Sequence, residues 1–217
     1  MSNSGQALPT IVEIKQALNR PLPGKQGQLL MAPLPITSKF DRWPIPEDCR
    51  EAGVLLLLFE KDAELHITLT RRHTYPGVHS GQIAFPGGQR EDNETLQETA
   101  LRETFEEVGV RPGSLEVIGQ LSSLYTPPSN FCIFPFVAYS AGRPAFRPDA
   151  REVAELIEAP LCLFFDPATQ KEELWHFENF GNRNVPFFDI FGHKVWGATA
   201  MILSEFLLML NSDFSVN

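Results

Sequence analysis

A group of glutamates at helical spacing, within residues 88–110, constrains this chain more than any other part of its sequence. The stretch 95–108 contains neither glycine nor proline, which predicts a helix. Glu103, Glu106 and Glu107 stand at positions i, i+3 and i+4 of that helix, so their three carboxylates would share one face. The chain must therefore place a crowded acidic face where something offsets its charge.

Three carboxylates within one helical turn repel one another unless cations lie among them. Mg²⁺ or Mn²⁺ is the natural occupant, since both ions prefer oxygen ligands and commonly join protein carboxylates to phosphates. A solvated acidic helix face is the simpler interpretation. The metal site is favoured because four further residues stand in register with the glutamates, namely Gly88, Glu94, Arg102 and Gly109.

The same segment resembles the Nudix box, the signature of the Nudix hydrolase family. It fits the pattern G-x5-E-x7-R-E-U-x-E-E-x-G-U, with U a bulky apolar residue, at every position except Thr104. The resemblance implies an α/β fold, the Nudix-type α/β/α sandwich with a mixed β-sheet. It also implies hydrolysis of a nucleoside diphosphate linked to another moiety, with Mg²⁺ or Mn²⁺ as the cofactor.

Roles for the box residues follow from the same resemblance. Glu103, Glu106 and Glu107 would be the main metal ligands, and the backbone of Gly87 would help to shape the metal site. Glu106, Glu107 and Arg102 would form the catalytic group. The resemblance thus implies that one face of the helix carries both the metal and the chemistry.

Two points within the box stay open. Arg102 would hold Glu94 and a ligand carboxylate in register, although an ordinary helix salt bridge to Glu106 is compatible with that role. The general base could be Glu107 or a glutamate from a later segment, and the later candidates are Glu152, Glu155 and Glu158.

A second pattern stands directly before the box, in residues 69–88. It resembles the coenzyme A pyrophosphatase motif L-L-T-x-R-[SA]-x3-R-x3-G-x3-F-P-G-G. The matching residues are Leu69, Thr70, Arg72, Gly81, Phe85, Pro86, Gly87 and Gly88. Thr68, His73 and Gly77 depart from it, and Gly77 stands where the motif has an arginine. Residues 127–131, 152–155 and 188–200 are also typical of that branch.

The substrate-binding residues implied by this motif are Arg72, Gly81, Phe85 and Arg71. Arg71 and Arg72 are neighbours on an expected strand, so they face opposite sides of it, and the motif points to Arg72 as the phosphate contact. Loop geometry alone is the simpler interpretation of Gly81 and Phe85. Trp196, at the end of a strand, is more often a core residue than a platform for a base.

The implied reaction is hydrolysis of the diphosphate of coenzyme A or acyl-coenzyme A to 3′,5′-ADP and (acyl-)4′-phosphopantetheine. A Nudix pyrophosphatase acting on ADP-ribose, a dinucleotide or an oxidised dNTP is one alternative, and Tyr125 and Pro127 lie where those branches carry a marker residue. A non-catalytic Nudix-fold binding domain is the other. Such domains usually lose box glutamates, which this chain keeps.

Charge and composition narrow the partners of this chain of 217 residues. A net charge of -9 without a basic run argues against nucleic acid, and no apolar run approaches the ~20 residues of a membrane span. A small-molecule substrate remains, with a homodimer left open. Cys132 and Cys162 lie in apolar runs that suggest buried thiols, and three scattered cysteines suggest a reducing, cytoplasmic location.

The chain divides into an N-terminal helix with a Pro-rich arm, residues 1–48, and a Nudix hydrolase domain, residues 49–217. Within the arm, residues 10–19 predict a helix and residues 21–48 an irregular segment. Residues 82–85 lead into an expected loop at 86–88. Apolar runs predict strands at 53–59, 115–124, 131–139, 173–180 and 185–195, a segment at 153–163 that begins as a strand, and a C-terminal helix at 198–210. Alternation at 65–70, with His66, Thr68 and Thr70 as the polar set, predicts a half-buried strand that forms a hairpin with 53–59.

Overall fold

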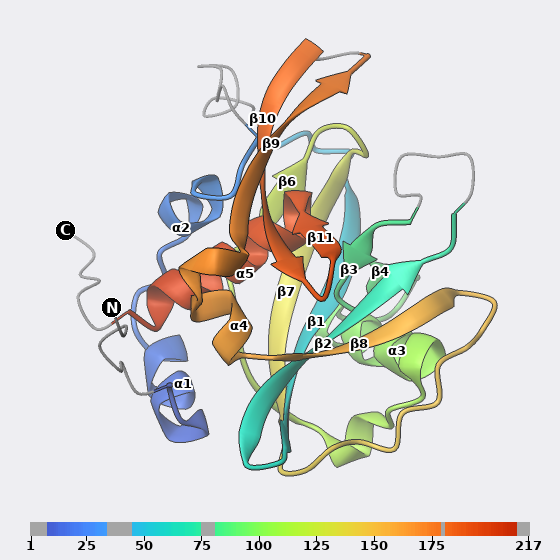
Figure 1. Ribbon diagram of the computed structural model, residues 1–217. Coiled ribbons are helices and arrows are strands. Elements are labelled where there is room, and N and C mark those ends of the chain that lie inside the picture. Colours follow the sequence, from blue (N-terminus) through green and yellow to red (C-terminus); the bar gives the residue numbers. More distant parts are fainter. Residues whose placement is uncertain (1–7, 34–44, 75–80, 179–180, 212–217) are drawn as a thin grey trace, which may run out of the picture.

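A mixed eight-stranded sheet forms the centre of the fold (Figure 1). The computed structural model describes residues 8–33, 45–74, 81–178 and 181–211. The strands of this sheet are β1 (Arg50–Lys61), β2 (Glu64–Arg72), β3 (Ile83–Ala84), β4 (Gly87–Gln89), β5 (Glu116–Gln120), β6 (Leu124–Thr126), β7 (Phe131–Ser140) and β8 (Val153–Pro160).

A smaller three-stranded sheet and the helices surround that centre. The small sheet contains β9 (Gln170–Phe177), β10 (Gly181–Ile190) and β11 (His193–Trp196), in the order β11-β10-β9. The α-helices are α1 (Ile11–Leu18), α2 (Lys25–Leu29), α3 (Leu96–Val108), α4 (Cys162–Phe165) and α5 (Gly197–Met209). The predicted first, Nudix-box and last helices are thus confirmed as α1, α3 and α5.

Strand β1 separates two apolar cores. Leu56 and Leu58 belong to a large core shared with α1, α5 and the small sheet. Leu55 and Leu57 belong to a second core under α3. Because successive side chains of a strand point to opposite faces, both faces of β1 need apolar cover. The predicted α/β/α sandwich is therefore confirmed.

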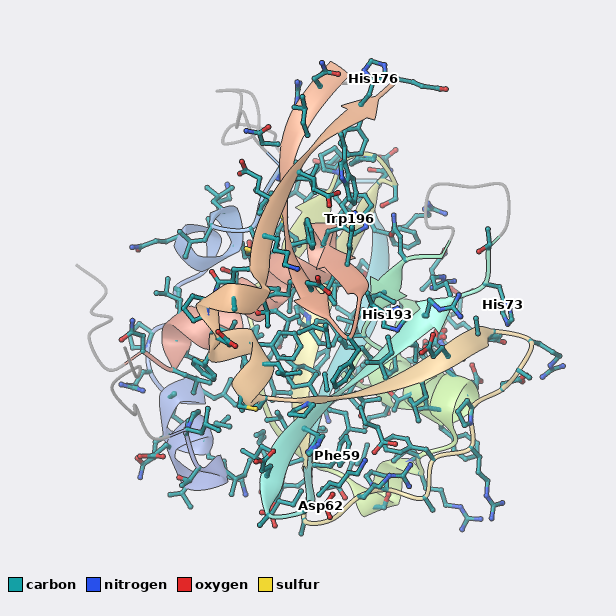
Figure 2. The ribbon with its side chains drawn as sticks, viewed as in Figure 1. Phe59, Asp62, His73, His176, His193 and Trp196 are labelled. Atoms are coloured by element: carbon teal, nitrogen blue, oxygen red, sulfur yellow. A yellow bond between two sulfur atoms is a disulfide. The ribbon has the colours of Figure 1, made fainter. Side chains whose placement is uncertain are left out.

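The sheet is mixed because β1 runs parallel to β7, whereas the other paired strands are antiparallel. A parallel pair needs a long crossover, and here the crossover contains β2 to β6 and the helix α3. Asp62, in the β1–β2 turn, and His73, just after β2, lie at opposite ends of β2 (Figure 2). The predicted β1–β2 hairpin is confirmed.

The expectation that β2 is only half-buried was wrong. Its alternating polar residues His66, Thr68 and Thr70 are buried together with Ile67 and Leu69. The strand lies inside the sheet, between β1 on one side and β8 on the other, and layers cover both of its faces. Alternation in the sequence shows which residues of the strand are polar. Whether those residues are buried depends on the strands and layers that pack around β2, which include segments far along the chain.

Three further expectations need correction. Residues 87–89 form strand β4 rather than a loop, and they pair with residues 52–54 of β1. The single strand expected at 115–124 is divided into β5 and β6, whereas the segment 153–163 begins as a strand, as predicted, and that strand ends at Pro160, before α4. The Pro-rich arm contains the short helix α2, although its residues 34–44 lie outside the described ranges.

The expectation of a buried thiol at Cys132 was also wrong. Cys132 forms a disulfide with Cys49, with 5.8 Å between the two Cα atoms, so it joins the segment before β1 to the start of β7. Cys162 is a free thiol whose pKa is raised by burial. No helix within the described ranges is long and apolar enough to span a bilayer.

The N-terminal arm is attached to the last helix through a buried carboxylate. Glu205 of α5 is fully buried and accepts hydrogen bonds from the Nε2 of Gln28 at 2.9 Å and from the backbone N–H of Gly24 at 3.2 Å and Ser122 at 3.1 Å. A Cβ added at Gly27 would lie 2.7 Å from the Cα of Glu205, so α2 and α5 approach closely. The division between residues 48 and 49 stays a prediction.

We predict that Gln28→Ala lowers the free energy of unfolding by about 1–3 kcal/mol, because it removes a hydrogen bond to the buried Oε2 atom of Glu205. Gln26→Ala changes an exposed glutamine of the same helix and should stay within ~0.5 kcal/mol of the wild type. Urea unfolding of the three proteins measures both values. Equal losses in the two variants would show that the bond to Glu205 contributes nothing specific.

Candidate active site

Helix α3 places the acidic face, and its ends explain its length. Thr95 caps the N-terminus through a reciprocal pair of hydrogen bonds with Glu98. Gly109 ends the helix in the left-handed conformation, with φ of 75°. A Cβ added at Gly53 of β1 would lie 2.3 Å from the carbonyl oxygen of Leu96, so this glycine lets the helix lie directly on the strand.

The three glutamates differ in how deeply they are buried. The Glu106 side chain is 49% exposed, that of Glu103 is 17% exposed, and Glu107 as a residue is only 7% exposed. A Cβ added at Gly88 would lie 2.4 Å from the carboxyl carbon of Glu103. The glycine of β4 thus leaves the space in which this carboxyl group lies.

Glu107 is the most strongly perturbed of the three. Burial raises the pKa of its carboxyl group to about 8, and the positive charge of Arg72 partly opposes that shift. One backbone hydrogen bond comes from Gly87, while the Oε2 atom is buried without a hydrogen-bond partner among the described residues. A buried carboxylate oxygen without a donor suits a cation better than any neutral neighbour.

Arg102 links the box carboxylates. Its Nε and Nη2 atoms donate to the two oxygens of Glu94 at 3.0 and 2.8 Å, and its Nη1 atom donates to Glu103 at 2.8 Å and Glu106 at 3.0 Å. The Arg102 bonds lower the pKa of Glu94 to about 2. Burial raises the pKa of Glu103, and the Arg102 bond opposes that rise. Both proposed contacts of Arg102, to Glu94 and to Glu106, are present.

The donor set fits a divalent cation by its chemistry. Three carboxylates and a strand backbone supply oxygen ligands, and one buried oxygen lacks a donor. Among the described residues, however, no three His, Cys, Asp or Glu side chains already converge as a metal cage. The Nη1 atom of Arg102 bonds Glu103 and Glu106 instead, so a cation must share these two carboxylates with Arg102.

Of the four substrate-binding residues expected from the motif, Arg71 and Gly81 line one shared pocket, whereas Arg72 and Phe85 do not. The positive charge of Arg72 acts to lower the pKa of the Glu107 carboxyl group. Arg71 instead donates a hydrogen bond from its Nε to Glu155 at 2.9 Å. Phe85 is buried in the large core, which favours the loop-geometry interpretation for this residue. Gly81 has a positive φ of 65° and follows the undescribed residues 75–80, which contain Gly77 and His79.

The later glutamates differ in their surroundings. Glu158 pairs with Lys61 and Arg143, and Glu155 pairs with Arg71 and His193. Glu152 is exposed, and its charge raises the pKa of both Glu103 and Glu107. Of the three later candidates, it is Glu152 whose charge reaches the acidic face.

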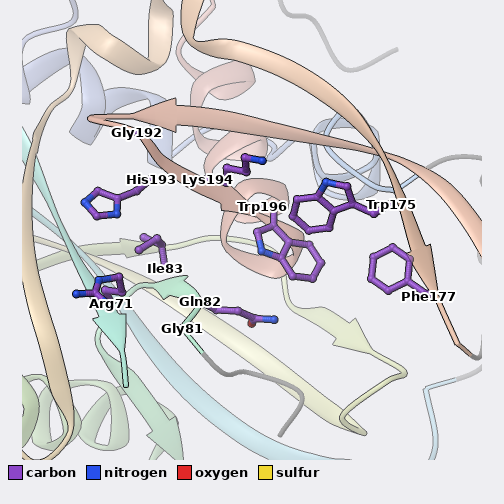
Figure 3. Close-up of a pocket in the computed structure, with 10 residues that line it drawn as sticks. All are labelled: Arg71, Gly81, Gln82, Ile83, Trp175, Phe177, Gly192, His193, Lys194 and Trp196. Atoms are coloured by element: carbon purple, nitrogen blue, oxygen red, sulfur yellow. The ribbon is translucent and has the colours of Figure 1, made fainter. Parts of the chain in front are cut away.

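A pocket of about 490 Å³ adjoins this region, and the sequence did not reveal it. Figure 3 shows three aromatic side chains at one end of it and Arg71 with His193 at the other. Its lining residues are Arg71, Gly81, Gln82, Ile83, Trp175, Phe177, Gly192, His193, Lys194 and Trp196. Trp196 was expected in the core, but it is only partly buried and lines the pocket. The sequence feature that could have indicated this pocket is the set of aromatic residues at 175, 177 and 196.

We predict that metal-free protein loses stability as pH rises from about 4.5 to about 8. In this window native Glu107 keeps a proton that the unfolded chain has lost, because its native pKa is about 8 and its ordinary value is 4.5. The stability of the wild type relative to Glu107→Gln should fall with pH, at a slope of up to about 1.4 kcal/mol per pH unit. Urea unfolding in EDTA between pH 5 and 8 measures the slope, and parallel curves would contradict it.

Comparison with known proteins agrees with this geometry. The NUDIX domain family model matches residues 50–177. Nudix hydrolase 3 of Caenorhabditis elegans is 31% identical over 199 residues, which cover 81% of this chain and 80% of the relative. The uncharacterized Nudix hydrolase NudL of Pectobacterium atrosepticum is 35% identical over 147 residues, 67% of this chain and 75% of the relative.

Among solved structures, a MutT/nudix family protein from Enterococcus faecalis is 18% identical, with a TM-score of 0.48 over 92% of this chain and 73% of that one. The match to the family model spans more than half of the chain and includes the whole acidic helix α3. The chain therefore belongs to the Nudix hydrolase family, whose members use divalent cations to hydrolyse phosphoric anhydrides of nucleoside diphosphate derivatives.

Proposed function

We propose that this enzyme hydrolyses the diphosphate of coenzyme A or its thioesters, giving 3′,5′-ADP and 4′-phosphopantetheine or its acyl form. The position of Arg72 carries the proposal. This residue ends β2, belongs to the pattern that resembles coenzyme A pyrophosphatases, and acts electrostatically on Glu107. The guanidinium group of Arg72 thus lies beside the carboxylates of α3. This pairing suits a diphosphate with a bound cation, because the guanidinium can contact the phosphates and the carboxylates can hold the cation.

Glu103, Glu106, Glu107 and the backbone of Gly87 would hold Mg²⁺ or Mn²⁺. Such an ion, when bound, neutralises phosphate charge and lowers the pKa of water. Glu107 would release the proton that burial leaves on it, because carboxylate ligands bind metals in the deprotonated form. The retained box glutamates also argue against a non-catalytic binding domain.

Arg102 would act as a positioning residue. It ties Glu103 and Glu106 to Glu94, and this arrangement holds the outer carboxylates in place while the substrate is bound. For the general base, Glu107 and Glu152 are the candidates that the electrostatics favour, since Glu155 and Glu158 are each held in ion pairs. A base must lose its proton before it can accept one from water.

The proposal extends to the organisation of the chain. Residues 1–48 would form an arm packed on a Nudix domain of residues 49–217, and the small-molecule substrate would be the main partner. A cytoplasmic location is part of the same proposal.

We predict that Glu106→Gln lowers kcat by on the order of 10³-fold, because it removes a ligand charge and keeps the side-chain shape. Glu106 is the most exposed of the three box glutamates, so the fold should persist. Glu172→Gln, at an exposed carboxylate of β9, is the matched control and should retain wild-type activity. Steady-state kinetics with Mg²⁺ or Mn²⁺ decide the point, and near-normal turnover would remove Glu106 from the mechanism.

We predict that coenzyme A is hydrolysed faster than dephospho-coenzyme A and that Arg72→Ala lowers kcat/KM for both substrates, because Arg72 lies beside Glu107, where the shared diphosphate would bind. A lost charge-assisted contact costs about 1.5–3 kcal/mol, or roughly 10–150-fold in kcat/KM. Arg111→Ala, at an exposed arginine beyond α3, should leave kcat/KM for both substrates unchanged. If ADP-ribose, a dinucleotide or an oxidised dNTP is hydrolysed tenfold faster than coenzyme A, the coenzyme A proposal fails.

A further inference from the structure

The pocket beside β3 combines ring faces with cations. Trp175 and Trp196 meet edge to face, with 4.8 Å between ring centroids and 74° between ring planes. In such a contact one ring keeps both of its faces outside the contact. Phe177 lies 6.2 Å from Trp196, and Lys194 and Arg71 also line the pocket. Flat aromatic surface suits a planar ring, and the two cations suit an anionic substituent on it.

We propose that this pocket binds the nucleotide half of the substrate, with the base against the Trp175–Trp196 pair and the phosphate on its ribose near Lys194 and Arg71. The inference rests on the proposed function and deepens it, since it assigns the two halves of coenzyme A to different places. The pantetheine half then lies outside the pocket. The size of the pocket, about 490 Å³, lies within the ~300–1,000 Å³ of small-molecule sites.

The pocket is joined directly to the acidic site through β2. The backbone N–H of Arg72 donates to the carbonyl of Gln82 at 3.0 Å, and Gln82 lines the pocket. Arg71 and Arg72 are consecutive on β2, so one side chain faces the pocket while the other faces Glu107. For a base held in the pocket, the attached diphosphate would have to pass the end of β2 to reach Arg72 and the acidic face.

Both cations already have carboxylate partners that a phosphate can replace or share. Lys194 pairs with Glu173 at 2.6 Å, and both side chains are more than two-fifths exposed, so water weakens the pair. Arg71 uses its Nε for Glu155, and a guanidinium has further N–H donors on its two terminal nitrogens. Neither Glu173 nor Glu155 lines the pocket, so the cations rather than the carboxylates face a ligand.

The competing occupant is the pantetheine arm with its acyl chain. Such a chain is flexible and uncharged along most of its length, so it would gain from apolar rings but not from Lys194 and Arg71. Strand β11, which supplies Lys194 and Trp196, lies beyond the residues matched by the family model. This part of the pocket therefore lies outside the segment that the family model matches.

The test measures binding to the full-length protein by calorimetry in EDTA, so that no hydrolysis occurs. The probes are 3′,5′-ADP, 5′-AMP and 4′-phosphopantetheine. We expect Trp196→Leu to weaken both nucleotides by about 10-fold, the size of a lost stacking contact, and to leave 4′-phosphopantetheine unchanged. Lys194→Ala should weaken 3′,5′-ADP by roughly 10-fold but not 5′-AMP, because only the former carries the additional phosphate.

Matched controls come from the same sheet. Phe191→Leu changes an exposed aromatic residue in the β10–β11 turn, and Lys171→Ala changes a lysine that pairs with Asp189; neither lines the pocket. Both should bind every probe as the wild type does. If Trp196→Leu lowers the melting temperature, Trp175→Leu takes its place with the same expectation.

Two outcomes overturn the inference, and both differ from failure of the proposed function. Weaker binding of 4′-phosphopantetheine alone in Trp196→Leu would assign the pocket to the pantetheine arm. Unchanged nucleotide affinity in both tryptophan variants, in an enzyme that hydrolyses coenzyme A, would reject the pocket while the proposed function stands. If wild type hydrolyses ADP-ribose instead but the tryptophan variants lose nucleotide affinity, the base site is supported and the coenzyme A proposal fails.

Discussion

The close contact between α3 and the sheet is the constraint on which the acidic site depends. Gly53 lets β1 pass beneath the first turn of the helix, and Gly88 leaves room on β4 for the carboxyl group of Glu103. A side chain at Gly53 would meet the backbone of α3 and lift the helix away from β1, whereas a side chain at Gly88 would displace the carboxyl group of Glu103. The helix lies low enough that Glu107 is buried, and the raised pKa of its carboxyl group follows from that burial.

Burial and charge act in opposite directions along this helix face. Near the sheet, desolvation dominates, so Glu107 favours its neutral form. Farther out, Arg102 neutralises the carboxylates that it bonds, and the pKa of Glu94 falls as a result. The protein therefore tolerates a cluster of like charges without a cation by leaving one carboxyl group protonated and pairing the others with one arginine.

Local patterns predicted the parts of the fold that depend on neighbours in sequence. The i, i+3, i+4 spacing placed the glutamates on one face of α3, and Gly109 marked its end. The polar Thr68 was assigned to a solvent face because alternation cannot report the layers above and below a strand. Gly87 was assigned to a loop, since nothing local to it indicates that β1 offers a pairing edge.

Long-range relations account for the rest of what the sequence did not reveal. Cys132 is 83 residues from its partner Cys49. Trp196 gains its place beside Trp175 only when β9, β10 and β11 assemble. The contacts of Arg102 with Glu94 and Glu106 were predictable because both glutamates lie within eight residues of it along the chain. Nearness in sequence thus separates what could be predicted of the site from what could not.

The N-terminal helices depend on contacts with α5, including the hydrogen bond from Gln28 of α2 to Glu205, and this dependence affects folding during synthesis. The segments that enclose Ile14 and Ala17 include α5, which is synthesised last among the described helices. On the ribosome the first helices therefore remain without their cover until residues 197–209 have emerged. A chain that ends before α5 would keep these apolar side chains exposed to chaperones and proteases. An incomplete chain therefore differs from the complete one in the apolar surface that it exposes.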